Sequence, residues 1–139
     1  MNGDLRIRKD LSERRTLAVG IASTVAYGLA GWVFCAATMG AAMAVTDLGH
    51  ALFIHALAAP AIFVAVSFLY FRRFGASYPL RTAIVFVAVV IAMDLFLVAL
   101  LIEKSFAMFE SFIGTWLPFA SIFLATWLTG IVLQRANSK

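Results

Sequence analysis

The sequence has few charged residues and almost no cysteine. Charged residues make up 13% of the chain and hydrophobic residues 63%, whereas a soluble domain carries about 25% charged and about 45–50% apolar residues. A chain with so little charge cannot shield its apolar surface from water, which excludes an ordinary soluble domain. Cys35 is the single cysteine, so an intrachain disulfide, a CxxC redox pair and a cysteine-based zinc site are also excluded.

Sequence motifs of common catalytic sites are absent as well. The chain contains no GxSxG nucleophile elbow and no glycine-rich phosphate-binding loop. His50 and His55 are five residues apart, which on a helix separates the two imidazoles by a net angle of about 140°. They therefore cannot form a same-face metal pair, and one chain cannot clamp a haem with both ligands on one helix. We predict no cofactor and no metal, and we favour a function other than catalysis while leaving an enzyme open.

What the sequence has instead is four long apolar runs. They cover approximately residues 17–38, 50–71, 82–102 and 112–134, and each is close to the roughly 20 residues that a helix needs to cross a bilayer. The first run exceeds the about 7–15 apolar residues of a secretory signal sequence, so we expect a retained helix. The chain is thus predicted to be a single all-α integral membrane domain, an up-down bundle of four transmembrane helices.

Basic residues are concentrated on one side of this arrangement. The polar tail at 1–15, the connection at 72–81 and the C-terminal tail hold ten of the eleven lysine and arginine residues, and the other is Lys104. Loops rich in lysine and arginine remain on the cytoplasmic side of a membrane. We therefore expect both termini in the cytoplasm, with the inner membrane as the location in a bacterium. The positive net charge is explained by topology, and the expected partner is the lipid bilayer, not nucleic acid.

One carboxylate, Asp94, lies near the middle of the third apolar run. A charge at this depth costs roughly 2.5–3.5 kcal/mol on insertion scales, so Asp94 should face protein or water. With a helix rise of about 1.5 Å per residue, Tyr27 falls close to the midplane, Ser121 about 3 Å and His55 about 7–8 Å to its outer side. We therefore predict a buried polar layer in which Tyr27, His55 and Ser121 donate hydrogen bonds to Asp94.

Two other sets of residues are candidates outside this layer. Pro60, near the middle of the second run, lacks an amide donor and clashes with the carbonyl four residues earlier, which predicts a helix kink. Acidic and histidine side chains lie on the outer connections, where a weak divalent-cation site is conceivable. These outer residues are Asp47, His50, Glu103 and Glu110.

Three roles for the Asp94 layer remain open. It can be an internal contact that fixes the register of the bundle, a protonatable site with His55 as its relay, or a site whose counter-charge comes from a partner helix. Our function prediction is proton- or cation-linked transport by a homo-oligomer, because four helices alone enclose little space. The alternative is a non-catalytic accessory or scaffold subunit of a larger membrane complex.

Overall fold

The computed structural model describes residues 2–102, 104 and 110–139, and this part of the chain is almost entirely helical. The elements are α1 (Asn2–Val45), α2 (Leu48–Phe74), α3 (Pro79–Met93), the π-helix η1 (Asp94–Ile102), the π-helix η3 (Phe112–Trp116) and α4 (Leu117–Asn137). η1 continues α3, and η3 leads directly into α4. Four stretches of the described residues are long and apolar enough to cross a membrane: Gly3–Val45, Leu48–Phe74, Pro79–Ile102 and Phe112–Asn137. The chain is therefore an all-α protein with the composition and helix lengths of a multi-pass membrane protein.

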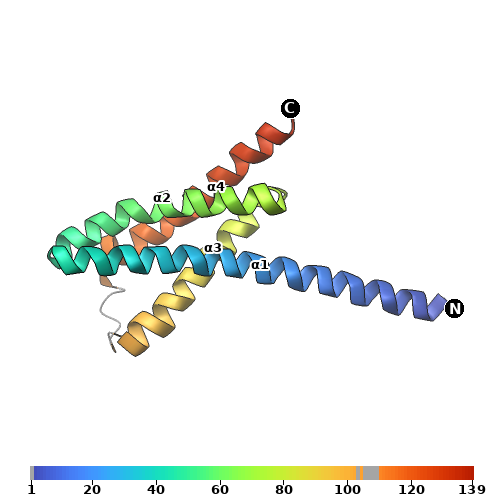
Figure 1. The fold of residues 1–139 in the computed structure, drawn as a ribbon, viewed down its shortest axis with the longest axis horizontal. Coiled ribbons are helices and arrows are strands. Elements are labelled where there is room, and N and C mark those ends of the chain that lie inside the picture. Colours follow the sequence, from blue (N-terminus) through green and yellow to red (C-terminus); the bar gives the residue numbers. More distant parts are fainter. Residues whose placement is uncertain (1, 103, 105–109) are drawn as a thin grey trace.

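The helices run alternately in opposite directions (Figure 1). Both termini and the α2–α3 connection lie toward one end of the molecule, while the α1–α2 connection lies at the other. α2 packs against α1 and α4, and α3 packs against the same two helices. The end that carries the termini therefore holds ten of the eleven basic residues.

α1 is longer at both ends than the apolar run predicts. The expected tail at 1–15 is part of the helix, where ion pairs such as Arg14 to Asp10, at 3.1 Å, link successive turns. At the other end the helix continues to Val45 instead of ending near residue 38. The added residues are mainly alanine and methionine, which favour helix, so the helix continues beyond the end of the predicted apolar run.

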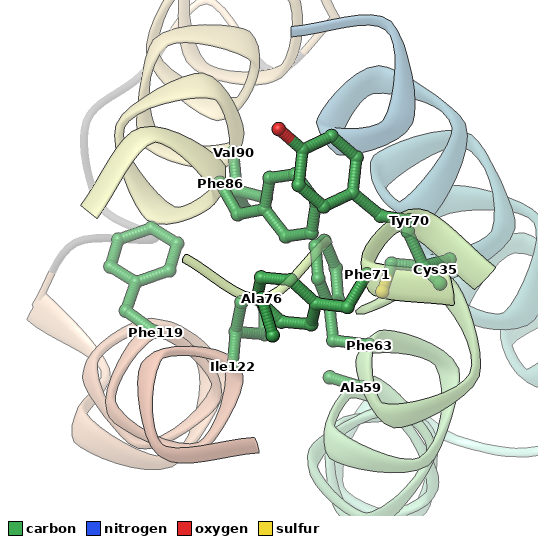
Figure 2. Packing of buried hydrophobic residues seen from close by; sticks show 11 residues of the cluster. Cys35, Ala59, Phe63, Tyr70, Phe71, Ala76, Phe86, Val90, Phe119 and Ile122 are labelled. Carbon is green, nitrogen blue, oxygen red and sulfur yellow. The ribbon is translucent and has the colours of Figure 1, made fainter. Parts of the chain in front are cut away.

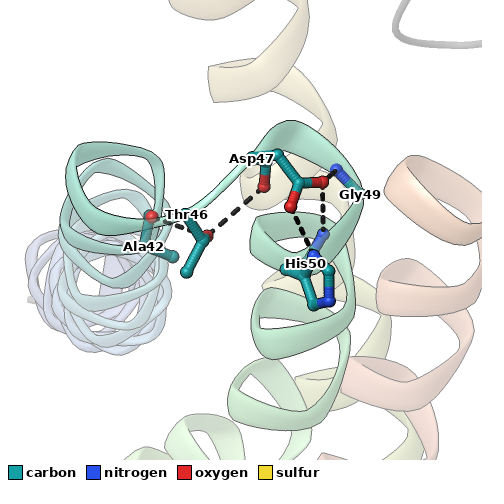
Figure 3. A network of polar contacts seen from close by, with 5 residues as sticks. All are labelled: Ala42, Thr46, Asp47, Gly49 and His50. Carbon is teal, nitrogen blue, oxygen red and sulfur yellow. Dashed lines mark hydrogen bonds and ion pairs between the residues drawn. The ribbon is translucent and has the colours of Figure 1, made fainter.

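After α1, the chain reverses direction at Thr46 and Asp47. The carboxylate of Asp47 accepts hydrogen bonds from the backbone N–H groups of Gly49 and His50, at 3.0 and 3.3 Å. These contacts satisfy backbone donors that have no partner within the first turn of α2. Figure 3 shows this cap and the hydrogen bonds of Thr46 beside it.

The prolines lie at different places in their helices. Pro79 and Pro118 lie in the first turns of α3 and α4, where a missing N–H costs nothing. Pro60 lies inside α2, which continues through it. The kink that the sequence predicts at Pro60 stays a prediction.

Aromatic rings form the core in the half of the bundle nearer the termini. Phe63 and Phe86 are fully buried and meet edge to face, with ring centroids 5.9 Å apart; Figure 2 shows these rings side by side with Tyr70. A Cβ added at Gly31 would lie 2.6 Å from the Phe63 ring. The absence of a side chain on α1 therefore allows this ring to approach the helix, as in other membrane bundles.

Candidate functional site

A cavity of about 560 Å³ lies between the helices, in the half of the bundle away from the termini. Every helix contributes residues to its lining. These residues lie within 32–40 on α1, 48–55 on α2, 90–102 on α3 and η1, and 111–122 at η3 and the start of α4. Small-molecule sites have volumes of about 300–1,000 Å³. The cavity is large enough for a ligand of that class.

The π-helices form part of the cavity wall. η1 contributes Asp94, Val98 and Ile102, and η3 contributes Gly114 and Thr115. In Figure 1, η1 diverges from α1 and α2 toward its C-terminal end. π-helical turns are rare and frequently occur at functional sites. The two π-helices therefore lie in the part of the bundle that contains the cavity.

Asp94 lies in the wall of the cavity, where α3 continues into η1. The indole Nε1 of Trp32, on α1, donates a hydrogen bond to Asp94 Oδ1 with a nitrogen–oxygen distance of 2.7 Å. An ionised carboxylate accepts about four hydrogen bonds through its two oxygens. Among the described residues Trp32 is the one side chain that donates to Asp94. The protein therefore fixes one carboxylate oxygen, and no described side chain donates to the other.

His55, on α2, lines the same cavity as Asp94. Its ring interacts with the main chain of Cys35 on α1, and its Nδ1 is buried without a hydrogen-bond partner in the described part of the chain. A buried nitrogen without a partner costs about 1–3 kcal/mol. Such a group indicates a ligand, a water molecule or a proton-transfer role at that position. The structure brings His55 and Asp94 to one cavity, without the direct hydrogen bond that the sequence predicts.

Tyr27 and Ser121 have other neighbours than the predicted ones. The Tyr27 ring packs edge to face against Tyr70 and Phe74, with centroid distances of 5.5 and 5.9 Å. The Ser121 hydroxyl donates to the carbonyl of Pro118 at 2.8 Å. A serine within a helix commonly satisfies itself on the preceding turn of its own backbone. The predicted hydrogen bond from Ser121 to Asp94 is therefore corrected, and Trp32, which the sequence does not select, takes the donor role.

The polar residues of the α1–α2 connection cap a helix. The ring Nδ1 of His50 donates to Oδ1 of Asp47 (Figure 3). This hydrogen bond, followed by that from the His50 backbone, lowers the pKa of Asp47. Glu110 is exposed, and Glu103 lies outside the described residues. The described residues contain no group of three histidine, cysteine or acidic side chains that is suited to a metal ion, so the cation site stays a prediction.

Two pairs of hydroxyl side chains form hydrogen bonds between helices elsewhere in the bundle. Thr24 and Tyr70 share a hydrogen bond of 2.7 Å between α1 and α2, and Ser67 donates to Thr126 at 3.1 Å between α2 and α4. These contacts join helices where they are closely packed. Asp94 and His55 differ from them because both border a cavity and both retain hydrogen-bonding capacity.

Comparisons with known proteins do not add to this description. No protein-family model, no curated protein and no solved structure matches the chain. The function is therefore inferred from the cavity and its polar groups.

Proposed function

We propose that this protein is a proton- or cation-linked membrane transporter, in which Asp94 is the ion-binding group and the cavity beside it holds the substrate. The observation that carries the proposal is the carboxylate of Asp94 in the wall of a 560 Å³ cavity. Ionisable residues within transmembrane segments are costly and commonly mark ion pathways or proton relays. A purely structural hydrogen bond needs no cavity beside it, because protein interiors are otherwise closely packed.

His55 is the proposed relay for protons. His55 lines the cavity that contains Asp94, and its Nδ1 has no hydrogen-bond partner in the described part of the chain. A proton that leaves the carboxylate therefore has an imidazole acceptor in the same wall. Imidazole is the side chain best suited to such a step near neutral pH. Cys35 is the other titratable side chain in the described wall, and lysine and arginine are absent from that wall. Cation binding is therefore not opposed by a fixed positive charge.

Transport also requires the chamber to change its opening. η1 and η3 both contribute residues to the wall of the cavity. Their i+5 hydrogen-bond pattern is less favourable than that of an α-helix. A local change between π- and α-helical pairing rotates the residues that follow it, and Asp94 is the first residue of η1. We propose these segments as the moving part of the transporter.

The orientation and assembly belong to the same proposal. Both termini are assigned to the cytoplasm, because their end of the molecule carries ten of the eleven basic residues. In a bacterium the protein would then lie in the inner membrane. The cavity lies within one chain, so each copy of the proposed homo-oligomer contains its own chamber.

A direct test uses liposomes that contain the purified protein, an acidic interior and an internal pH-sensitive dye. External sodium, potassium or tetraphenylphosphonium chloride is then added, and the rise of internal pH is compared with that of protein-free liposomes. We expect at least one of these cations to dissipate the gradient. Asp94→Asn should reduce the initial rate by about tenfold or more, as for loss of a group essential to the step.

The matched control is Glu13→Gln, which makes the same chemical change at an exposed carboxylate of α1. This variant should retain the wild-type rate, and Asp94→Glu should recover part of it. If no cation releases protons, the transport proposal is wrong. An Asp94→Asn protein that no longer elutes as a single species would instead favour the alternative, an accessory or scaffold subunit, in which the Trp32 contact holds α1 and η1 together.

A further inference from the structure

We propose that the cavity binds a lipophilic monovalent cation, with the apolar body of the ligand filling the chamber and its positive charge beside Asp94. As a substrate class this inference rests on the proposed function, but the binding itself can be measured without transport. The proposal follows from the charge, the aromatic rings and the extent of the cavity.

The charge of the cavity wall has one sign. Asp94 supplies the only carboxylate among the described lining residues, and neither lysine nor arginine is among them. A carboxylate in surroundings of low polarity gains far more from a counter-charge than it does in water. Trp32 gives Asp94 a hydrogen bond but no positive charge. The chamber therefore favours a cationic ligand and disfavours an anion of the same shape.

Aromatic rings complete the cation site. The indole of Trp32 is fixed next to the carboxylate through its own hydrogen bond, and Phe119 of α4 contributes a second ring to the lining. Cations bind to the faces of aromatic rings, most strongly to tryptophan, and desolvation strengthens this attraction. A diffuse organic cation loses less hydration on entry than a metal ion does, so it suits this apolar chamber better.

The remaining wall is mostly apolar and extends to one end of the bundle. Leu52, Val90, Val98 and Ile122 offer aliphatic surface. Gly40 also lines the cavity, and a Cβ placed there would meet nothing within 4 Å. Such a surface binds an apolar molecular body through the apolar area that it removes from water.

The test compares two probes with the same shape and opposite charge, tetraphenylphosphonium and tetraphenylborate. Equilibrium dialysis of the radiolabelled probes against the full-length protein in a mild detergent gives their affinities, after subtraction of binding to empty micelles. Tetraphenylphosphonium should bind about tenfold or more tightly than tetraphenylborate. Asp94→Asn should lower its affinity by a similar factor, whereas Glu13→Gln should leave it unchanged.

A second variant tests the chamber without altering the carboxylate. Ala36 lines the cavity, and Ala36→Phe should reduce tetraphenylphosphonium binding by filling the space. Equal affinity for both probes, or undiminished binding to both Asp94→Asn and Ala36→Phe, would overturn the inference. Cation-driven proton release without tetraphenylphosphonium binding would refute the ligand class and leave the transporter proposal intact. Tetraphenylphosphonium binding without any proton release would refute the transporter proposal and leave the ligand class intact.

Discussion

Removing the hydrogen bond between Trp32 and Asp94 should destabilise the bundle by about 1–1.7 kcal/mol. Interhelical hydrogen bonds in membrane proteins contribute about 0.6 kcal/mol on average and at most about 1.7 kcal/mol in double-mutant cycles. A bond to an ionised group is roughly twice as strong as a neutral one. The nitrogen–oxygen distance of 2.7 Å is at the short end of the range for such charge-assisted contacts. The expected value therefore lies above the average and near the upper limit.

A double-mutant cycle separates this contact from packing. Trp32→Phe removes the donor and keeps an aromatic ring, and Asp94→Ala removes the acceptor without adding volume. Each single variant also alters its surroundings, so the test uses only the coupling energy between the two changes. Unfolding by sodium dodecyl sulfate in mixed micelles, followed by circular dichroism, gives the four free energies that are needed.

The control cycle replaces Trp32→Phe with Trp127→Phe. Trp127 packs against Phe123 of its own helix, with ring centroids 6.0 Å apart, and does not line the Asp94 cavity. This pair should be additive within about 0.5 kcal/mol, as for sites that do not interact. A coupling energy of the same small size for Trp32 and Asp94 would refute the hydrogen bond and the placement of α1 against η1.

Two further predictions concern packing and capping. Gly130→Ala should destabilise the protein by about 1–3 kcal/mol relative to Gly20→Ala. A Cβ added at Gly130 would lie 2.5 Å from Cβ of Pro79, whereas a Cβ added at Gly20 would meet nothing within 4 Å. Equal unfolding midpoints of the two variants would contradict the close approach at Gly130. The pKa of Asp47 is lowered by its hydrogen bonds with His50, so its stabilising effect is present above the ordinary carboxyl pKa of about 3.9 and is lost as the pH falls through the lower, folded-state value. The difference in melting temperature between the wild type and Asp47→Ala should therefore shrink in strong acid, and a pH-independent difference would count against the carboxylate cap.

The features that the sequence predicts well are local ones. The four helices that are long and apolar enough to cross a membrane follow from run length and hydropathy. The polar layer depends on comparing depths between helices, which requires correct helix ends. α1 ends at Val45 instead of residue 38, a shift of about seven residues or roughly 10 Å. Because of that error, the depth comparison selects Tyr27 as the partner of Asp94 on α1, whereas the structure has Trp32 in that position. Side chains in helices also point back toward the N-terminus of the helix, which a comparison of backbone depths leaves out.

The irregular segments could not be predicted from the same pattern. Hydrophobic periodicity distinguishes helix from strand, but η1 reads as a continuous apolar run whether its hydrogen bonds are of the α or the π type. Its π-helical course from Asp94 to Ile102 becomes visible only in the assembled bundle. The cavity could not be predicted from the sequence either, because its volume depends on how far the ends of the helices diverge.

The two halves of the bundle differ in how their space is filled, and this difference explains where a site can form. Toward the termini, the Phe63 ring occupies the room that Gly31 leaves, and Phe86 closes the space behind it. In the other half, a Cβ added at Gly40 would meet nothing within 4 Å, and the described residues leave a cavity there. Closely packed interiors resist rearrangement, whereas regions with few contacts open at low cost. The packed half can therefore hold the helices together, while the half containing Asp94 is the part in which we propose that a ligand binds and the helices move.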